Sequence, residues 1–202
     1  MKTKNLYNFP SQFVYWESIE QHEEIKKNIF QKIIDHSNTL NQLYKNKDDL
    51  EYYNSYMCKT SYFLNDNNDN FLFNLLEEYN YLNLIIWNVI DNLLENKNLN
   101  IVQYPKKSNI GKIWYNVYSP GGYHDMHTHG AHEGFAGVYI LDLNEKNTTT
   151  FFTSGNKFFE KTFYLEDISE GSVIIFPTNL IHSVRPSLKN RVTISFNINC
   201  SF

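Results

Sequence analysis

The sequence has few cysteines, no block of basic residues and no long hydrophobic run. Cys58 and Cys200 stand far apart and form no Cys-x-x-Cys or Cys-x-x-His pair, which excludes a zinc finger and is typical of reduced thiols. No apolar segment approaches the roughly 20 residues that cross a bilayer. Residues Met1 to Pro10 lack the basic and then apolar order of a signal peptide. We therefore expect a cytoplasmic protein that does not span a membrane.

Charge and length narrow the class of protein further. The formal net charge is -4, and lysine and arginine do not cluster, so nothing indicates sequence-independent binding of nucleic acid. The 202 residues, 42% of them hydrophobic, suffice for one ordinary domain with a sizeable core. We predict a single domain over residues 1–202, with 1–104 as mainly helical support and 105–202 as a core of strands.

Two segments of the N-terminal half have helical periodicity. Ser18 begins a Ser-x-x-Gln capping box, and isoleucines follow at every fourth position, 25, 29 and 33. The second segment has apolar residues at steps of three and four: Leu75, Leu76, Tyr79, Leu82, Ile86, Ile90, Leu93 and Leu94. Both patterns predict amphipathic helices that cover one face of a sheet.

After Pro105 the pattern changes to short β-rich runs. The predicted strands are Ile113 to Tyr118, Tyr123 to His129, Phe135 to Leu141, Thr148 to Phe152, Phe158 to Tyr164, Ser172 to Phe176, and Arg191 to Asn197. Breakers such as Pro120-Gly121-Gly122 and Glu170-Gly171 separate them. Many short strands at this spacing predict an α+β protein with a jelly-roll barrel or sandwich, braced by the helices.

The histidines are unevenly distributed. Four of the seven occur within nine residues, at positions 124, 127, 129 and 132, and His182 follows a distant strand. Residues two apart on a strand share a face, so His127 and His129 should point to one place. A third imidazole from another strand would complete one face of an octahedral metal site and leave positions for oxygen and a chelating substrate. We assign that third position to His182, and we expect His124 and His132 on the surface.

Two polar pairs on strands are candidates for binding an anion. The run from Arg191 to Asn197 alternates so that Arg191 and Thr193 share the polar face. A guanidinium and a hydroxyl in this arrangement can clamp a carboxylate. Upstream, Asn116 and Tyr118 also share a face and can donate to a carboxylate or keto oxygen, although Tyr118 is equally a candidate core aromatic.

These residues form three ordered blocks that resemble the Fe(II)- and 2-oxoglutarate-dependent oxygenases. The match is closest to the small 2-oxoglutarate-Fe(II) oxygenases of bacteria and phages. The first block is His127-Thr128-His129 with the strand Phe135 to Ile140. The second runs from Gly171 through an apolar strand and Phe-Pro to His182, and the third is Arg191 to Asn197. The resemblance covers residues 114 to 197 well and the helical half loosely.

The resemblance implies a double-stranded β-helix with Fe(II) at His127 and His182. It implies that Arg191 binds the cosubstrate 2-oxoglutarate with help from Thr193. The pair at 116 and 118 looks like the cosubstrate-binding pair of related nucleic-acid demethylases. The implied activity is that of a hydroxylase, which consumes O2 and 2-oxoglutarate and releases succinate and CO2.

The sequence departs from the family at one metal ligand. Most members have His-x-Asp where this chain has His127-x-His129, so the usual carboxylate is missing. Either His129 coordinates in place of the aspartate, or Asp125 or Glu133 supplies a carboxylate nearby. We expect His129 to be the third ligand.

Two alternative functions remain open at this point. The motifs of the cupins are nearly satisfied, by Gly121, His127, His129 and Glu133 and by Gly171, Pro177 and His182. This would give a metalloprotein with three histidines and one glutamate that does not use 2-oxoglutarate. A metal-free jelly-roll binding protein is the other alternative. Peptide side chains, small metabolites and nucleobases all stay open as substrates, and we favour a peptidyl residue by analogy of fold alone. The first helix or a strand edge could mediate a homodimer.

Overall fold

The computed structural model describes residues 4–9, 12–43, 55–62, 71, 74–75, 80–96, 107–129, 134–143, 149–152, 162–164 and 168–201. The helices are α1 (His22–Leu43) and α4 (Asn80–Leu94). The strands are β1 (Lys4–Phe9), β2 (Gln12–Ser18), β3 (Ser55–Thr60), β4 (Lys107–His127), β5 (Gly134–Leu143), β6 (Thr149–Phe152), β7 (Thr162–Tyr164), β8 (Ser172–Pro177), β9 (His182–Val184) and β10 (Arg191–Ser201).

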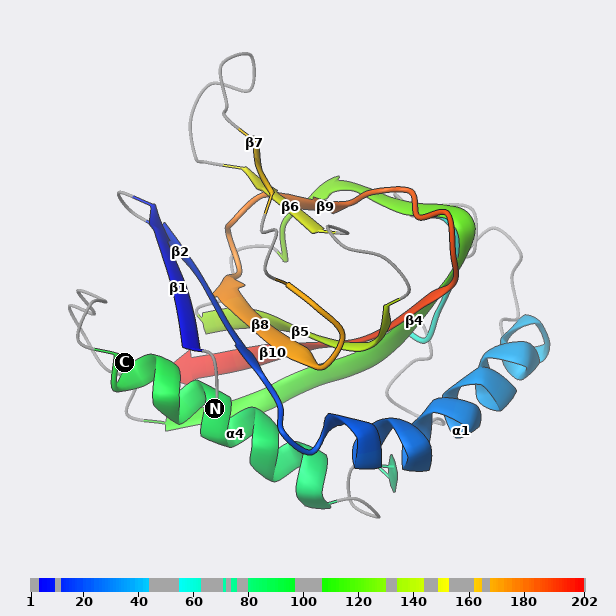
Figure 1. Cartoon of the computed structure of the whole chain (residues 1–202), viewed down its shortest axis with the longest axis horizontal. Coiled ribbons are helices and arrows are strands. Elements are labelled where there is room, and N and C mark those ends of the chain that lie inside the picture. The colour runs from blue at the N-terminus through cyan, green and yellow to red at the C-terminus, as the bar shows by residue number, and fades with distance from the viewer. Residues whose placement is uncertain are drawn as a thin grey trace.

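The strands form one antiparallel sheet that curls over itself. Its order is β1-β2-β8-β5-β10-β4-β9-β6-β7, and β3 also pairs with β4. In Figure 1, β9, β6 and β7 lie on the side of the roll opposite β8, β5 and β10, and α1 and α4 lie beneath the latter strands. The predicted α+β double-stranded β-helix with helices on one sheet is confirmed. Within the described ranges, no helix has the length and apolar character needed to cross a bilayer.

The helices attach to the sheet through the apolar faces that the sequence predicts. Ile25, Ile29 and Ile33 of α1 are each at most 5% exposed, and they pack in the same core as Ile86 and Ile90 of α4. Two glutamates in the first turn of α1 favour its start, because they face the positive end of the helix dipole. This core lies between the helices and the sheet.

A second apolar core fills the inside of the roll. Strand β8 serves both cores, since Ile174 and Phe176 belong to the inner one and Val173 and Ile175 to the outer one. A strand buried on both faces reads as a continuous apolar run in sequence, as here. The inner core reaches the histidines, because the rings of Phe176 and His182 pack edge to face with centroids 4.6 Å apart.

The structure differs from the prediction around Pro120 and Gly121. Two strands were predicted there, but β4 continues from Lys107 to His127. Gly121 has a φ of 83°, a conformation that glycine adopts at little cost, and its N–H donates to the carbonyl oxygen of Ser187 at 2.6 Å. Pro120 and Gly121 therefore lie where the pairing of β4 changes. Residues 107–118 of β4 pair with β10, whereas His124 and His127 pair with β9.

Polar contacts also join α1 to the sheet. Two histidines of α1 take part, and the first of them, His22, is only 7% exposed. Its Nδ1 is hydrogen-bonded to the Tyr139 hydroxyl at 2.8 Å, and Nδ1 of His36 is bonded to the Tyr115 hydroxyl at the same distance. These histidines therefore fasten the helix to the strands. The N-terminal half also contributes β1, β2 and β3, which the sequence pattern did not reveal.

Candidate active site

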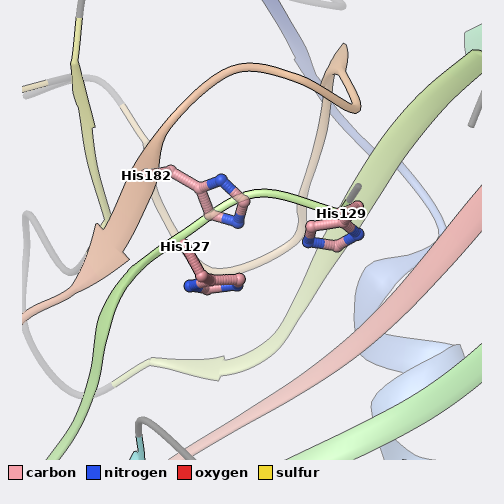
Figure 2. A group of neighbouring side chains, drawn as sticks. All are labelled: His127, His129 and His182. Atoms are coloured by element: carbon pink, nitrogen blue, oxygen red, sulfur yellow. The ribbon is translucent and has the colours of Figure 1, made fainter. Parts of the chain in front are cut away.

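Three imidazoles converge where β4 and β9 meet. His127 and His182 are paired residues of these antiparallel strands, and His129 follows two residues after β4, where its N–H donates to the carbonyl oxygen of Thr178 at 2.9 Å. One ring nitrogen from each histidine lies within 4.8 Å of the other two. Figure 2 shows the three rings grouped around one space. Such a group can hold a metal ion.

Hydrogen bonds set the tautomers of His127 and His182. Nδ1 of His127 lies 2.8 Å from the backbone oxygen of Asp125, and Nδ1 of His182 lies 2.9 Å from that of Leu180. A carbonyl oxygen can only accept, so each Nδ1 carries the hydrogen and each Nε2 keeps its lone pair. A histidine that ligates a metal almost always donates its other N–H in this way.

Asn197 sets the tautomer of His129 in the same way. Its Oδ1 lies 2.7 Å from Nδ1 of His129, which again leaves Nε2 as the nitrogen able to bind a cation. Asn197 was not among the predicted site residues. The sequence pattern could have indicated its position, because the alternation that places Arg191 and Thr193 on one face of β10 also places residue 197 there.

Burial keeps these histidines neutral. The pKa of His182 lies well below 6.5, because the ring is buried and because charge on the neighbouring histidines would repel its own. Burial lowers the pKa of His129 to about 4 and also lowers that of His127. Neutral imidazole is the form that binds metal ions, so the site is prepared for a cation at neutral pH.

His124 lies in the wall of the same cavity rather than on the surface as expected. Its ring stacks on that of His127 with centroids 4.2 Å apart. Burial, together with the neighbouring histidines, lowers its pKa to about 3. The expectation failed because β4 continues past Gly121 and pairs His124 with Val184 of β9. His132 lies outside the described residues.

The predicted anion-binding residues line this cavity together with the three histidines. Arg191 pairs with Tyr118, and Thr193 pairs with Asn116, across β10 and β4. Arg191 is 1% exposed, and its guanidinium carbon lies 4.1 Å from the centroid of the Tyr118 ring. A buried guanidinium favours an anion in the adjoining space, because a charge away from water needs an opposite charge nearby.

Asn116 contributes a further polar group to the cavity. Its Nδ2 donates to the hydroxyls of Thr193 at 3.4 Å and Ser195 at 3.2 Å. Its buried Oδ1 has no hydrogen-bond partner among the residues that the structure describes. Hydroxyls both donate and accept, so the amide can turn over, keep these bonds and present its NH2 group to the cavity. A bound molecule with carboxylate oxygens fits this wall.

The carboxylates considered as metal ligands do not join the group. The side chain of Asp125 is exposed, and only the backbone oxygen of this residue touches the site, as the acceptor for His127. Glu133, the residue on which the cupin motif depends, lies outside the described residues. In the described part of the chain, the cluster at β4 and β9 consists of His127, His129 and His182 alone.

Comparison with protein families gives a match over residues 112–197, which run from β4 to β10 and include every residue of the cavity wall named above. The matching family is described as "Putative 2OG-Fe(II) oxygenase". No curated protein matches the chain by sequence.

Several solved structures share the fold. A prolyl-4-hydroxylase from Pseudomonas putida is 10% identical, with 93% of each chain covered and a TM-score of 0.53. A Trichoplax adhaerens prolyl hydroxylase, solved with a peptide fragment of hypoxia inducible factor, is 14% identical, with 88% of this chain and 79% of that chain covered and a TM-score of 0.55. The viral collagen prolyl hydroxylase of Paramecium Bursaria Chlorella virus-1 is 12% identical, with 93% and 96% covered and a TM-score of 0.51.

The chemistry of the cavity agrees with these comparisons. Three neutral imidazoles suit a divalent iron ion, and a buried guanidinium on the same cavity wall suits a dicarboxylate. Over residues 112–197 and in its fold, the chain is therefore similar to the Fe(II)- and 2-oxoglutarate-dependent oxygenases, whose cofactors are Fe(II), 2-oxoglutarate and O2.

Proposed function

We propose that His127, His129 and His182 hold the Fe(II) and that Arg191 binds the far carboxylate of 2-oxoglutarate. Thr193, Asn116 and Tyr118 assist Arg191 in this role. The observation that supports the proposal is that one cavity is lined both by the three imidazoles and by the buried guanidinium. Metal and cosubstrate can therefore occupy adjoining positions.

The bound iron and 2-oxoglutarate supply the oxidising chemistry, in which O2 is reduced, 2-oxoglutarate is converted to succinate and CO2, and a substrate C–H bond is hydroxylated. The protein positions the reactants and limits access of water. Trp114 lines the cavity, and Phe151 and Phe176 pack beside His182. Three neutral ligands leave the metal with its full positive charge, which strengthens its attraction for the dianionic cosubstrate.

We favour a peptidyl residue as the substrate and keep a small molecule as the alternative. An open groove of about 570 Å³ adjoins the cavity, and His124 and Val184 belong to the walls of both. Met126, Arg185 and Pro186 line this groove, and the Met126 side chain is 56% exposed. An open groove suits an extended chain that inserts one side chain toward the metal. The Trichoplax relative was solved with a peptide.

The test of the proposed function compares the chain's two arginines. Calorimetry would measure 2-oxoglutarate binding to protein loaded with Mn(II), and a coupled assay would measure succinate. Arg191→Ala should weaken binding by about thirtyfold or more, because it removes one partner of a buried charge pair. Arg185→Ala, which alters an exposed residue of the groove, should bind as the wild type does.

Thermal melts would show that both variants are folded. A folded Arg191→Ala protein with wild-type affinity for 2-oxoglutarate would contradict the proposed cosubstrate site. Wild-type protein that binds the metal but not 2-oxoglutarate would favour the cupin-type alternative.

A further inference from the structure

An irregularity of β4 turns His124 into the cavity. His124 pairs with Val184 of β9 and His127 pairs with His182, so β4 has one residue more than β9 between these two pairs. Such an extra residue is a β-bulge, which re-aims a side chain. Residues three apart on a regular strand point to opposite faces, yet the rings of His124 and His127 stack with their planes at 22°. The bulge therefore brings a fourth imidazole to the face of the proposed metal ligands.

His124 lies where the cavity opens into the groove. Among the described residues, only His124 and Val184 line both the cavity and the groove. They are cross-strand partners, so their side chains lie next to each other at this opening. A substrate that enters from the groove passes this pair before it reaches the metal. Val184 offers apolar contact alone, whereas His124 also offers polar groups.

The hydrogen bonding of His124 differs from that of the three other histidines of the cavity. Each of His127, His129 and His182 has Nδ1 bonded to a protein oxygen. The ring of His124 makes no hydrogen bond within the part of the chain that the structure describes, and it does not belong to the metal-binding group. A neutral imidazole has a donor at one nitrogen and an acceptor at the other. Both can therefore serve a molecule at the opening.

We infer that His124 is a specificity-determining residue, which hydrogen-bonds a main-chain amide of the peptidyl substrate where the substrate enters the cavity. This inference rests on the proposed function, because it states how the same site recognises its substrate. Every peptide unit apart from that of proline carries one N–H donor and one C=O acceptor. An imidazole can bind either of them whatever the side chain of the substrate residue is.

The groove beside His124 suits the flanking residues of a peptide. Tyr123 and Met126 in its wall supply apolar surface. The described wall also contains one acidic and one basic residue, Asp125 and Arg185, so it favours neither sign of charge on the substrate. The partner that fits is therefore an extended peptide without a run of charge of one sign.

Three substitutions at residue 124 separate hydrogen bonding from packing. His124→Phe keeps a ring that can stack on His127 but has no polar group, His124→Gln keeps a donor and an acceptor, and His124→Ala removes the ring. The probe is a synthetic library of short peptides of varied sequence, capped at both ends. Fluorescence anisotropy would measure their binding to protein loaded with Mn(II) and 2-oxoglutarate in the absence of O2.

We expect the phenylalanine and alanine variants to bind the tightest peptide about fivefold more weakly, the loss typical of one net hydrogen bond. Glutamine should stay within about twofold of the wild type. Ser183→Ala is the control, because Ser183 lines the groove but not the cavity, and it should also stay within about twofold. His124→Phe should bind Mn(II) and 2-oxoglutarate as tightly as the wild type does.

A change in the peptide shows which of its groups His124 binds. The tightest peptide would be made again with an ester in place of each amide in turn, which removes an N–H and weakens the carbonyl acceptor. At one position the ester should weaken binding to the wild type but not to His124→Phe, because the partner of that amide is already gone. Equal losses in both proteins at every position would exclude a bond from His124 to the main chain.

Two further results would overturn the inference. One is wild-type peptide affinity in His124→Phe. The other is an equal loss of affinity for Mn(II) in that variant, because the ring would then act through His127 and not on the substrate. Wild-type protein that binds 2-oxoglutarate but no peptide of the library would refute the peptidyl substrate, and the role of His124 with it. The proposed metal and cosubstrate site would stand in these cases, since Arg191→Ala tests it separately.

Discussion

His127 of β4 and His182 of β9 are cross-strand partners whose ring centroids lie 4.2 Å apart. Their approach is therefore set by the pairing of two antiparallel strands and not by the conformation of a loop. Strand β9 has only three residues, but it pairs with β4 on one side and with β6 on the other. Sites built on paired strands hold their geometry well, so these two ligands form a rigid half of the proposed metal centre.

The third proposed ligand, His129, is the place to test the departure from the common His-x-Asp pattern. We expect His129→Asp to retain Fe(II), because a carboxylate can occupy the same position. His129→Ala should lose affinity for the metal by at least about tenfold, since one of three protein ligands is gone. Anaerobic titration with Fe(II) would measure both. Equal affinity of His129→Ala and the wild type would show that His129 is not a ligand.

A second prediction concerns Asn197, which orients His129 through a bond of 2.7 Å. Asn197→Ala should weaken metal binding by about 10- to 100-fold, the usual effect of removing a partner of a ligating histidine. Asn199→Ala is the control, because Asn199 lies two residues further along β10 and is exposed. Titration with Mn(II), followed by calorimetry, would compare the variants. Similar losses in both would mean that the effect comes from β10 as a whole and not from the bond to His129.

Much of the site could be predicted because it depends on local alternation. The period of two along a strand is enough to group Arg191 with Thr193 and Asn116 with Tyr118, and all four line the cavity. The isoleucine spacing likewise predicted α1 and the face that it buries. These signals are contained in a few neighbouring residues, and tertiary packing does not change them.

The remaining features depend on pairings between distant segments. His124 was expected on the surface because nothing local shows that β4 passes Gly121 and pairs with β9. The pairing of Cys58 of β3 with Tyr118 of β4 follows a shift in the register of β3 at Met57, and the sequence carries no glycine there to mark it. The hydrogen bonds of the two helical histidines could not be predicted either, because their tyrosine partners lie on strands far along the chain.

The attachment of α1 to the sheet should make stability depend on pH. Lys26 of α1 donates to Asp142 at 2.6 Å and to Glu170 at 2.5 Å. Burial alone would raise the pKa of Glu170, but hydrogen bonds from Lys26, the N–H of Leu143 and His22 together lower it below 4.5. The folded protein therefore binds this proton less readily than the unfolded chain does. The resulting stability is present above pH 4.5 and is lost as the pH falls through the lowered pKa.

Glu170→Gln should remove this contribution. We expect it to lower the free energy of unfolding by about 1 kcal/mol at about pH 7, a modest value because both partners are partly exposed. At about pH 3 the two proteins should differ less, since the wild-type carboxyl is then largely protonated. Urea denaturation at the two pH values would measure the change. Asp125→Asn, which neutralises an exposed carboxylate of β4, should shift neither value. A difference between Glu170→Gln and the wild type that is the same at both pH values would show that the contact acts through packing and not through charge.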